Sequence, residues 1–267
     1  MRPIFTLPGL AMLMVAHVAV AATERATYTF AGTLSALEAG APALLATDPL
    51  EQNGFETTSL YGQERNIYRW AGNASSAVQG GLTLDTTNLI PADHYSLSMV
   101  FELTDAADSW RRIVDVQDRA SDNGLYVHPT NVLNVYPLGD VGTSAWTNDT
   151  FHHVVLTNSS TSPTSTVKVY LDGVLEFTVE TDVMQVSNSA NLMHFFLDNI
   201  DGSGPNEYSN GRVAIIRLYE GVLTDSEVSQ LATDPFQALP VPEPETHALM
   251  LAGLGLVGYA AYRRRRV

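Results

Sequence analysis

The chain has 267 residues, contains no cysteine, and carries 29 acidic against 14 basic residues, for a formal net charge of −15. This length suits one large domain or two small ones, and without cysteine the fold must be held by its core rather than by disulfide bonds. Five basic residues, Arg2 and Arg263 to Arg266, lie in the end segments, so the middle is more acidic still. Such a surface repels phosphate backbones and argues against nucleic-acid binding.

The N-terminus has the three-part layout of a secretory signal peptide. Arg2 supplies the early positive charge, an apolar stretch runs from about Leu10 to Val20, and the small residues Ala19 and Ala21 flank Val20. We expect cleavage after Ala21 and export of the remaining chain, since the apolar run is short for a membrane anchor.

The middle of the chain is predicted to be all-β. Residues 95–103 alternate apolar and polar side chains, as a strand with one buried face does. Two apolar-rich runs flank Asp172-Gly173, a pair that readily supplies the positive φ values of a tight hairpin turn. Segment 35–48 is ambiguous, because Gly40 and Pro42 interrupt its helix formers, and is read as irregular or one helical turn. Further predicted strands cover residues 82–84, 112–116, 125–127, 132–136, 152–157, 192–197 and 212–219.

A short helix is predicted after the last strand. Thr224 can cap the backbone N–H of Glu227 while the Glu227 side chain reaches back, and Leu223 can pack on Val228. Asp234-Pro235 then ends the helix. From Gln237 the composition changes to a linker rich in Pro and Glu, which we expect to keep the tail clear of the domain.

Four stretches occur in order along the chain: RIVD at 112–115 followed by SDNGLYV at 121–127, FHHVVLT at 151–157, VYLDG at 169–173, and the strand and capped helix of 211–228. In order and spacing they resemble the laminin-G-like members of the concanavalin A-like sandwich over roughly residues 80–231. The resemblance implies two antiparallel sheets packed face to face as a jelly roll, with any ligand site on the loops at the rim.

The tail combines Pro242-Glu243-Pro244, an uncharged run of 17 residues at 246–262, and the cluster Arg263, Arg264, Arg265 and Arg266. The run is near the lower limit for spanning a bilayer, and the arginines would hold its end in the cytoplasm. Together the three parts resemble the PEP-CTERM sorting signal of Gram-negative bacteria. That resemblance implies processing by an exosortase, with an inner-membrane-anchored intermediate that is later placed at the cell surface or in the extracellular matrix.

The predicted organisation is therefore a signal peptide at 1–21, a sandwich at 22–236, a linker at 237–245, and a transmembrane sorting helix with its arginine tail at 246–267.

No catalytic residues are predicted. Sandwich glucanases carry Glu-x-Asp-x-Glu or a close variant on one strand, whereas Glu180-Thr181-Asp182 here lacks the second glutamate. The pair His152-His153 is read as structural, because neighbouring side chains on a strand point to opposite faces and cannot readily chelate one ion.

Calcium is the predicted metal. The loop after residue 197 is dense in oxygen ligands, and we expect Asp198, Glu207 and then Asp201 to bind Ca²⁺, as laminin-G-like domains often do at the rim. The alternative is that these acids only stabilise a turn. Asp115, Asp118 and Asp122 form a second acidic loop that ranks lower.

Aromatic side chains near loops could stack on sugar rings, and Trp110, Tyr126 and Tyr208 are the predicted ligand-binding residues, ahead of Tyr136 and Trp146. The alternative for each ring is packing in the core or at its lip.

The predicted function is thus a non-catalytic, exported module that binds an extracellular polysaccharide or a surface protein. The alternatives are a structural matrix protein without a discrete site and, ranked below it, a polysaccharide-active enzyme.

Overall fold

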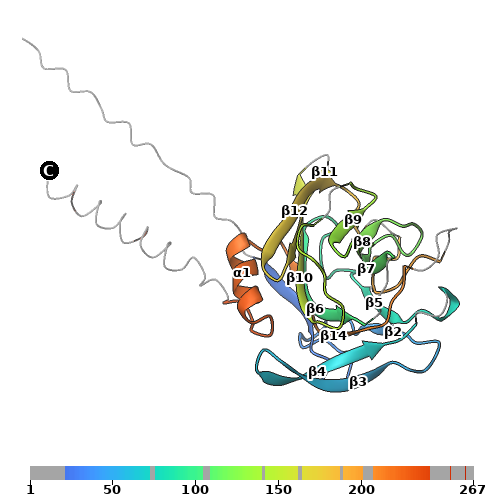
Figure 1. Cartoon of the computed structure of the whole chain (residues 1–267). Coiled ribbons are helices and arrows are strands. Elements are labelled where there is room, and N and C mark those ends of the chain that lie inside the picture. The colour runs from blue at the N-terminus through green and yellow to red at the C-terminus, as the bar shows by residue number, and fades with distance from the viewer. Residues whose placement is uncertain are drawn as a thin grey trace, which may run out of the picture.

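The computed structural model describes residues 22–72, 76–104, 109–139, 142–161, 164–186, 189–200 and 207–240, together with 253 and 262. These residues form fourteen strands, one short 3₁₀-helix and one α-helix (Figure 1). The elements are β1 (Thr23–Tyr28), β2 (Leu45–Thr47), β3 (Gly54–Leu60), β4 (Gln63–Trp70), η1 (Ser76–Val78), β5 (Gly81–Asp85), β6 (Tyr95–Leu103), β7 (Arg111–Asp115), β8 (Gly124–Val127), β9 (Leu133–Tyr136), β10 (His152–Thr161), β11 (Thr164–Leu171), β12 (Val174–Thr181), β13 (Leu192–Phe195), β14 (Gly211–Glu220) and α1 (Asp225–Thr233).

The strands form two antiparallel sheets. The large sheet has the order β12-β11-β10-β6-β14-β4-β3, with β1 also paired to β14, and the small sheet has the order β2-β5-β13-β7-β8-β9. The predicted two-sheet antiparallel sandwich is confirmed. The sandwich also extends further towards the N-terminus than residue 80, because β1, β2, β3 and β4 are all part of it.

The core lies between the two sheets and is rich in aromatic side chains. Trp70 on β4 stacks on Phe196 with ring centroids 3.8 Å apart, and Phe101 on β6 lies 5.2 Å from the same ring. A Cβ atom at Gly211 would lie 2.4 Å from the Trp70 ring, so only glycine lets β14 pass this close to the indole. The core therefore ties the large sheet to the segment that follows β13.

The predicted turn and helix signals are confirmed. Asp172 and Gly173 have φ values of 50° and 84° and join β11 to β12. Thr224 accepts the backbone N–H of Glu227, and the Glu227 side chain accepts the backbone N–H of Thr224, which completes the capping box of α1. Within the ambiguous segment 35–48, the only regular element described is the short strand β2.

The outer face of the large sheet is covered by α1 and by the C-terminal segment, residues 234–240. Val228 and Leu231 of α1 pack on the sheet in one apolar cluster with Ala22 and Leu239. The Arg217 side chain on β14 donates to the backbone carbonyls of Phe236 and Gln237. The first residues of the predicted linker thus pack against the sandwich, and both ends of the described domain lie beside α1.

No helix within the described residues combines the length and apolar character needed to cross a membrane. The predicted signal peptide at 1–21 and the sorting residues Pro242, Glu243, Pro244 and Arg263 to Arg266 lie outside the described residues.

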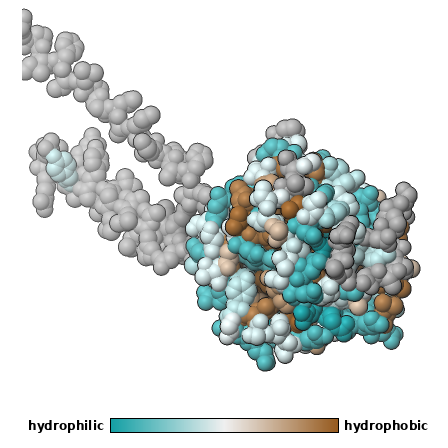
Figure 2. Space-filling view, viewed as in Figure 1, coloured by the Kyte–Doolittle hydropathy of each residue, from teal (hydrophilic) through white to brown (hydrophobic). Residues whose placement is uncertain are grey.

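Hydrophilic side chains predominate on the face drawn in Figure 2, and apolar side chains occur there in separate patches. Among the described residues, the large hydrophobic side chains that are more than half exposed are Leu37, Leu45, Val174, Ile200 and Tyr262. They come from different parts of the chain.

Candidate functional site

The outer face of the small sheet carries a row of buried polar side chains. Leu125 and Val127 on β8 point into the core, so Tyr126 between them points to the opposite face. Strand register places Arg112 on β7 beside Tyr126, and Asn134 on β9 beside Tyr126 on the other side. All three side chains are buried, although they lie on the face turned away from the other sheet.

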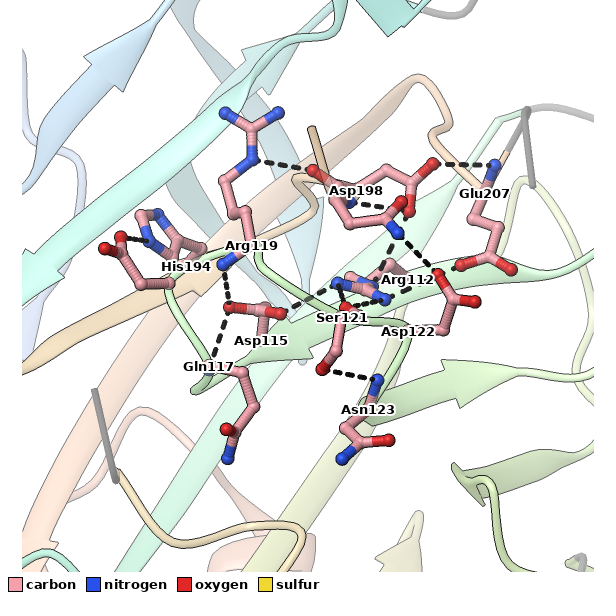
Figure 3. Close-up of polar contacts among 12 residues, drawn as sticks. Arg112, Asp115, Gln117, Arg119, Ser121, Asp122, Asn123, His194, Asp198 and Glu207 are labelled. Atoms are coloured by element: carbon pink, nitrogen blue, oxygen red, sulfur yellow. Dashed lines mark hydrogen bonds and ion pairs between the residues drawn. The ribbon is translucent and has the colours of Figure 1, made fainter. Parts of the chain in front are cut away.

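Arg112 is the centre of this polar network (Figure 3). Its guanidinium lies 2.8 Å from Asp115, 3.6 Å from Glu207 and 3.8 Å from Asp198, and donates to the Ser121 carbonyl at 3.0 Å. The Arg112 side chain is fully buried, and a buried charge is costly unless it is paired and hydrogen-bonded. The surrounding carboxylates supply that pairing.

Two loops cover Arg112 and fix its partners. In the loop between β7 and β8, Asp115 accepts the backbone N–H groups of Gln117 and Arg119. The Arg119 side chain then donates to the backbone carbonyl of Asp198 at 2.6 Å, in the segment that follows β13. Asn199 donates to Asp122 and ties the two loops together once more. Figure 3 shows these side chains converging from both loops.

Glu207 is the most strongly perturbed acid of the network. Burial, with help from the negative charge of Asp198, raises the pKa of Glu207 to about 7 against the opposing effects of Tyr126 and Arg112. The Tyr126 hydroxyl lies 2.7 Å from Glu207 Oε2 and 2.8 Å from the Asp122 carbonyl oxygen. The Tyr126 hydroxyl thus stabilises the carboxylate form of Glu207, whereas burial, the larger effect, favours the protonated form.

The structure describes two of the three residues that were predicted to bind calcium. Asp198 and Glu207 are brought together, since the Glu207 backbone N–H donates to Asp198 Oδ2 at 3.3 Å. Asp201 lies outside the described residues. Across the described ranges, no three His, Asp or Glu side chains are arranged to hold a metal ion. The described carboxylates enclose the Arg112 guanidinium, so by themselves they do not fit a calcium site.

The aromatic residues predicted to bind a ligand differ in how far they are buried. Tyr126 is fully buried, so in this structure its ring face is not available to a sugar; Tyr208 is 8% exposed. Trp146 is buried against Phe101 and His152. Trp110 is only partly buried, and its ring makes an edge contact with the ring of the buried Tyr126.

The aromatic patch, as we define it, consists of Trp110, His128 and Tyr136. The Trp110 ring centroid lies 4.5 Å from His128 and 5.4 Å from Tyr136, and all three side chains are partly exposed. The patch continues inward to Glu207 through the buried Tyr126. This arrangement offers ring surfaces and polar groups close together, held by a rigid network.

The paired histidines behave as predicted from strand geometry. His152 Nδ1 lies 2.7 Å from an Asp172 carboxylate oxygen, whereas His153 Nε2 lies 2.8 Å from the Ser98 hydroxyl. The two rings have separate partners, so they do not form one chelating site.

Arg112 was not predicted as a site residue. A signal was nevertheless present, because Arg112 opens a predicted strand, and a charged side chain in a buried strand needs charged partners. Asp115 is a local partner, but Asp198 and Glu207 lie more than 80 residues further along the chain and could not be identified as partners from the local sequence.

Comparison with known proteins gives two family matches. A family model described as the concanavalin A-like lectin/glucanases superfamily matches residues 75–229, which is more than half of the chain. The PEP-CTERM protein-sorting motif matches residues 240–266. None of the curated proteins matches the chain.

Solved structures share the fold at low sequence identity. Domain 4 of AbnA, a GH43 extracellular arabinanase from Geobacillus stearothermophilus in complex with arabinotriose, has a TM-score of 0.54 at 21% identity and covers 80% of this chain and 100% of that chain. Botulinum neurotoxin type C, whose cell entry depends on interaction with two ganglioside molecules, has a TM-score of 0.55 at 12% identity and covers 81% of this chain. The chain spans about half of that neurotoxin chain, at 52%. At these identities the likeness concerns the fold.

Proposed function

Because the chain belongs to the concanavalin A-like lectin/glucanases superfamily and carries a PEP-CTERM protein-sorting motif, we propose that it is an exported surface or matrix protein that binds extracellular glycan without catalysis. The observation that carries the proposal is the aromatic patch of Trp110, His128 and Tyr136. Its partly exposed rings suit the C–H faces of sugars.

Two structural neighbours support a sugar ligand for this fold. The arabinanase domain is solved with arabinotriose, and the type C neurotoxin interacts with gangliosides. These are ligands of those two proteins, and a shared fold does not by itself assign them to this chain. They make a glycan the first ligand to test, ahead of a protein partner.

The sorting motif implies export and processing by an exosortase. We further propose that residues 246–267 hold the protein in the inner membrane until processing near Pro242-Glu243-Pro244, after which it reaches the cell surface or the matrix. The intact mass of the released protein tests this step. A released form that retains Tyr262 and the terminal arginines would contradict it.

A glycan array with the sandwich fragment 22–240 tests the ligand. We expect selective binding that Trp110→Ala weakens at least tenfold, because the central ring of the patch is lost. Phe55→Ala is the matched control, since Phe55 is also an exposed aromatic residue, 42% exposed, but lies on β3 in the other sheet. Equal binding by wild type and Trp110→Ala would refute the site.

Two alternatives have separate outcomes in the same experiments. A structural matrix protein without a discrete site would give no selective glycan signal. A polysaccharide-active enzyme would release sugar fragments from a bound polymer, whereas we expect no turnover.

Calcium binding by Asp198, Asp201 and Glu207 stays a separate prediction. Arg112 already lies within ion-pair distance of Asp198 and Glu207, so a calcium ion would have to compete with a fully buried guanidinium. A higher melting temperature in millimolar calcium than in EDTA would support the ion, and equal melting temperatures would contradict it.

A further inference from the structure

A row of four charged side chains crosses the outer face of the large sheet, with two arginines in the middle and a glutamate at each end. Strand register places Arg212 on β14 beside Arg69 on β4 and, on its other side, beside Glu102 on β6. Arg69 Nε lies 2.7 Å from Glu56 on β3, and Arg212 Nε pairs with Glu102. Two guanidiniums are thus neighbours on one face, in a chain whose acidic residues outnumber its basic ones by two to one.

Both arginines line an open hollow of about 360 Å³. This volume is near the lower end of the range for small-ligand sites. Gln52, Thr104 and Asn210 contribute amide and hydroxyl groups to its wall, and Trp70 and Gly211 complete it on the side of the core. Hydrogen-bonding groups of this kind suit sugar hydroxyls.

Two of the three charged side chains that line the hollow are arginines, although the protein as a whole is acidic. Arg69 and Arg212 line it together with Glu56, whereas Glu102 is buried beneath the row with 1% of its side chain exposed. The side chains of Arg69 and Arg212 are 40% and 33% exposed. Both pairs use Nε, so within the described residues these two pairs leave the Nη groups of the guanidiniums for a ligand.

We propose that this hollow binds an acidic sugar unit of a polysaccharide, with the Nη groups of Arg69 and Arg212 holding its carboxylate or sulfate group. A planar guanidinium matches a carboxylate through two parallel hydrogen bonds, and it binds the oxygens of a sulfate in the same manner. The exposed Glu56–Arg69 pair is the kind of contact that contributes little to stability, so a ligand anion can replace it at little cost.

The hollow is distinct from the aromatic patch. It lies on the large sheet, whereas Trp110, His128 and Tyr136 lie on or beside strands of the small sheet. The acidic-sugar site goes beyond the proposed function and can hold or fail independently of it. Trp110→Ala should leave binding of an acidic polymer at the hollow unchanged.

Binding of polygalacturonate, a sulfated polysaccharide and a neutral polysaccharide to the purified full chain in mild detergent tests the proposal by affinity electrophoresis or calorimetry. We expect at least one of the two acidic polymers to bind, and its binding to weaken as the salt concentration is raised. Any binding of the neutral polymer should not depend on the residues of the hollow. The preferred acidic polymer distinguishes a carboxylate from a sulfate ligand. Absence of binding by both acidic polymers would overturn the proposal.

Arg69→Gln should weaken acidic-polymer binding at least tenfold, and Glu56→Gln should leave it equal or tighter because a repelling carboxylate is removed. Arg212→Gln leaves buried Glu102 without its partner, so the double variant with Glu102→Gln tests Arg212 without that penalty. Arg25→Gln is the matched control, because Arg25 is a similarly exposed arginine, at 39%, outside the hollow. Unchanged affinity in Arg69→Gln and in the double variant would also overturn the proposal.

Discussion

Replacing Glu207 by glutamine should change how the stability of the sandwich depends on pH. Glutamine has nearly the shape of a protonated glutamic acid, and it can accept from Tyr126 through its carbonyl oxygen while its amide group offers a donor. The substitution therefore imitates the protonated form of Glu207 and removes the titration. The charged and titratable groups that face Glu207 are Arg112, Asp198, Asp122 and Tyr126.

The sign follows from the direction of the pKa shift. Folding raises the pKa of Glu207 from 4.5 to about 7, so the folded protein binds a proton that the unfolded chain has already released. Stability linked to this proton is present at low pH and is lost as the pH rises from about 4.5 to about 7. Each pKa unit corresponds to about 1.4 kcal/mol, so the loss between pH 5 and pH 8 should be about 2 to 3 kcal/mol.

Urea unfolding of wild type and Glu207→Gln at pH 5 and pH 8 measures this effect. The quantity to compare is the difference between the two proteins, because other titrating groups, such as His153, then cancel. We expect Glu207→Gln to gain about 2 to 3 kcal/mol relative to wild type on going from pH 5 to pH 8. A difference that is the same at both pH values would refute the view that Glu207 is protonated by its buried surroundings.

Three further substitutions test other parts of the structure. Arg112→Met should lower the free energy of unfolding by about 3 to 5 kcal/mol, because it leaves buried carboxylates without their cation. Arg25→Met, which removes only an exposed ion pair, should change the free energy of unfolding by less than about 1 kcal/mol. Similar losses in the two variants would contradict the central role of Arg112. Burial lowers the pKa of His153 from 6.5 to about 4, so the free energy of unfolding should fall as the pH drops through this range. His153→Gln should reduce this fall, measured by urea unfolding at pH 7 and pH 4.5. An equal fall in wild type and variant would contradict the role of His153. Thr224→Ala should cost about 1 kcal/mol in urea unfolding through loss of the helix cap, and a change within error would mean that α1 is held by Val228 and Leu231 alone.

The fold was predictable because its signals are local. Alternation over residues 95–103 gave β6 with the predicted bounds, Asp172-Gly173 supplied the hairpin, and Thr224 with Glu227 supplied the helix start. Strands β3 and β4 were missed because charged and polar residues such as Glu56, Arg65 and Arg69 weaken their apolar alternation.

The candidate site was predictable only in part. Asp198 and Glu207 were identified from the density of oxygen ligands in one loop, but their partner Arg112 comes from a strand far away in the sequence. Tyr126 was expected at the rim because it lies near a loop. It is buried instead, because two loops that are separate in sequence fold over it and close the network around its hydroxyl group.

Strand β14 connects the proposed acidic-sugar hollow to the part of the domain that leads to the C-terminal tail. β14 begins at Gly211, which lines the hollow together with the two arginines, and ends at Glu220, shortly before α1 and the C-terminal segment that leads to the sorting motif. If a bound polymer is pulled while the tail is fixed, the tension runs along β14. This strand is hydrogen-bonded to β6, β4 and β1, and its hydrogen bonds to them lie across the direction of pull. Until processing separates the tail, those bonds would then be loaded together in shear, which favours resistance to mechanical rupture.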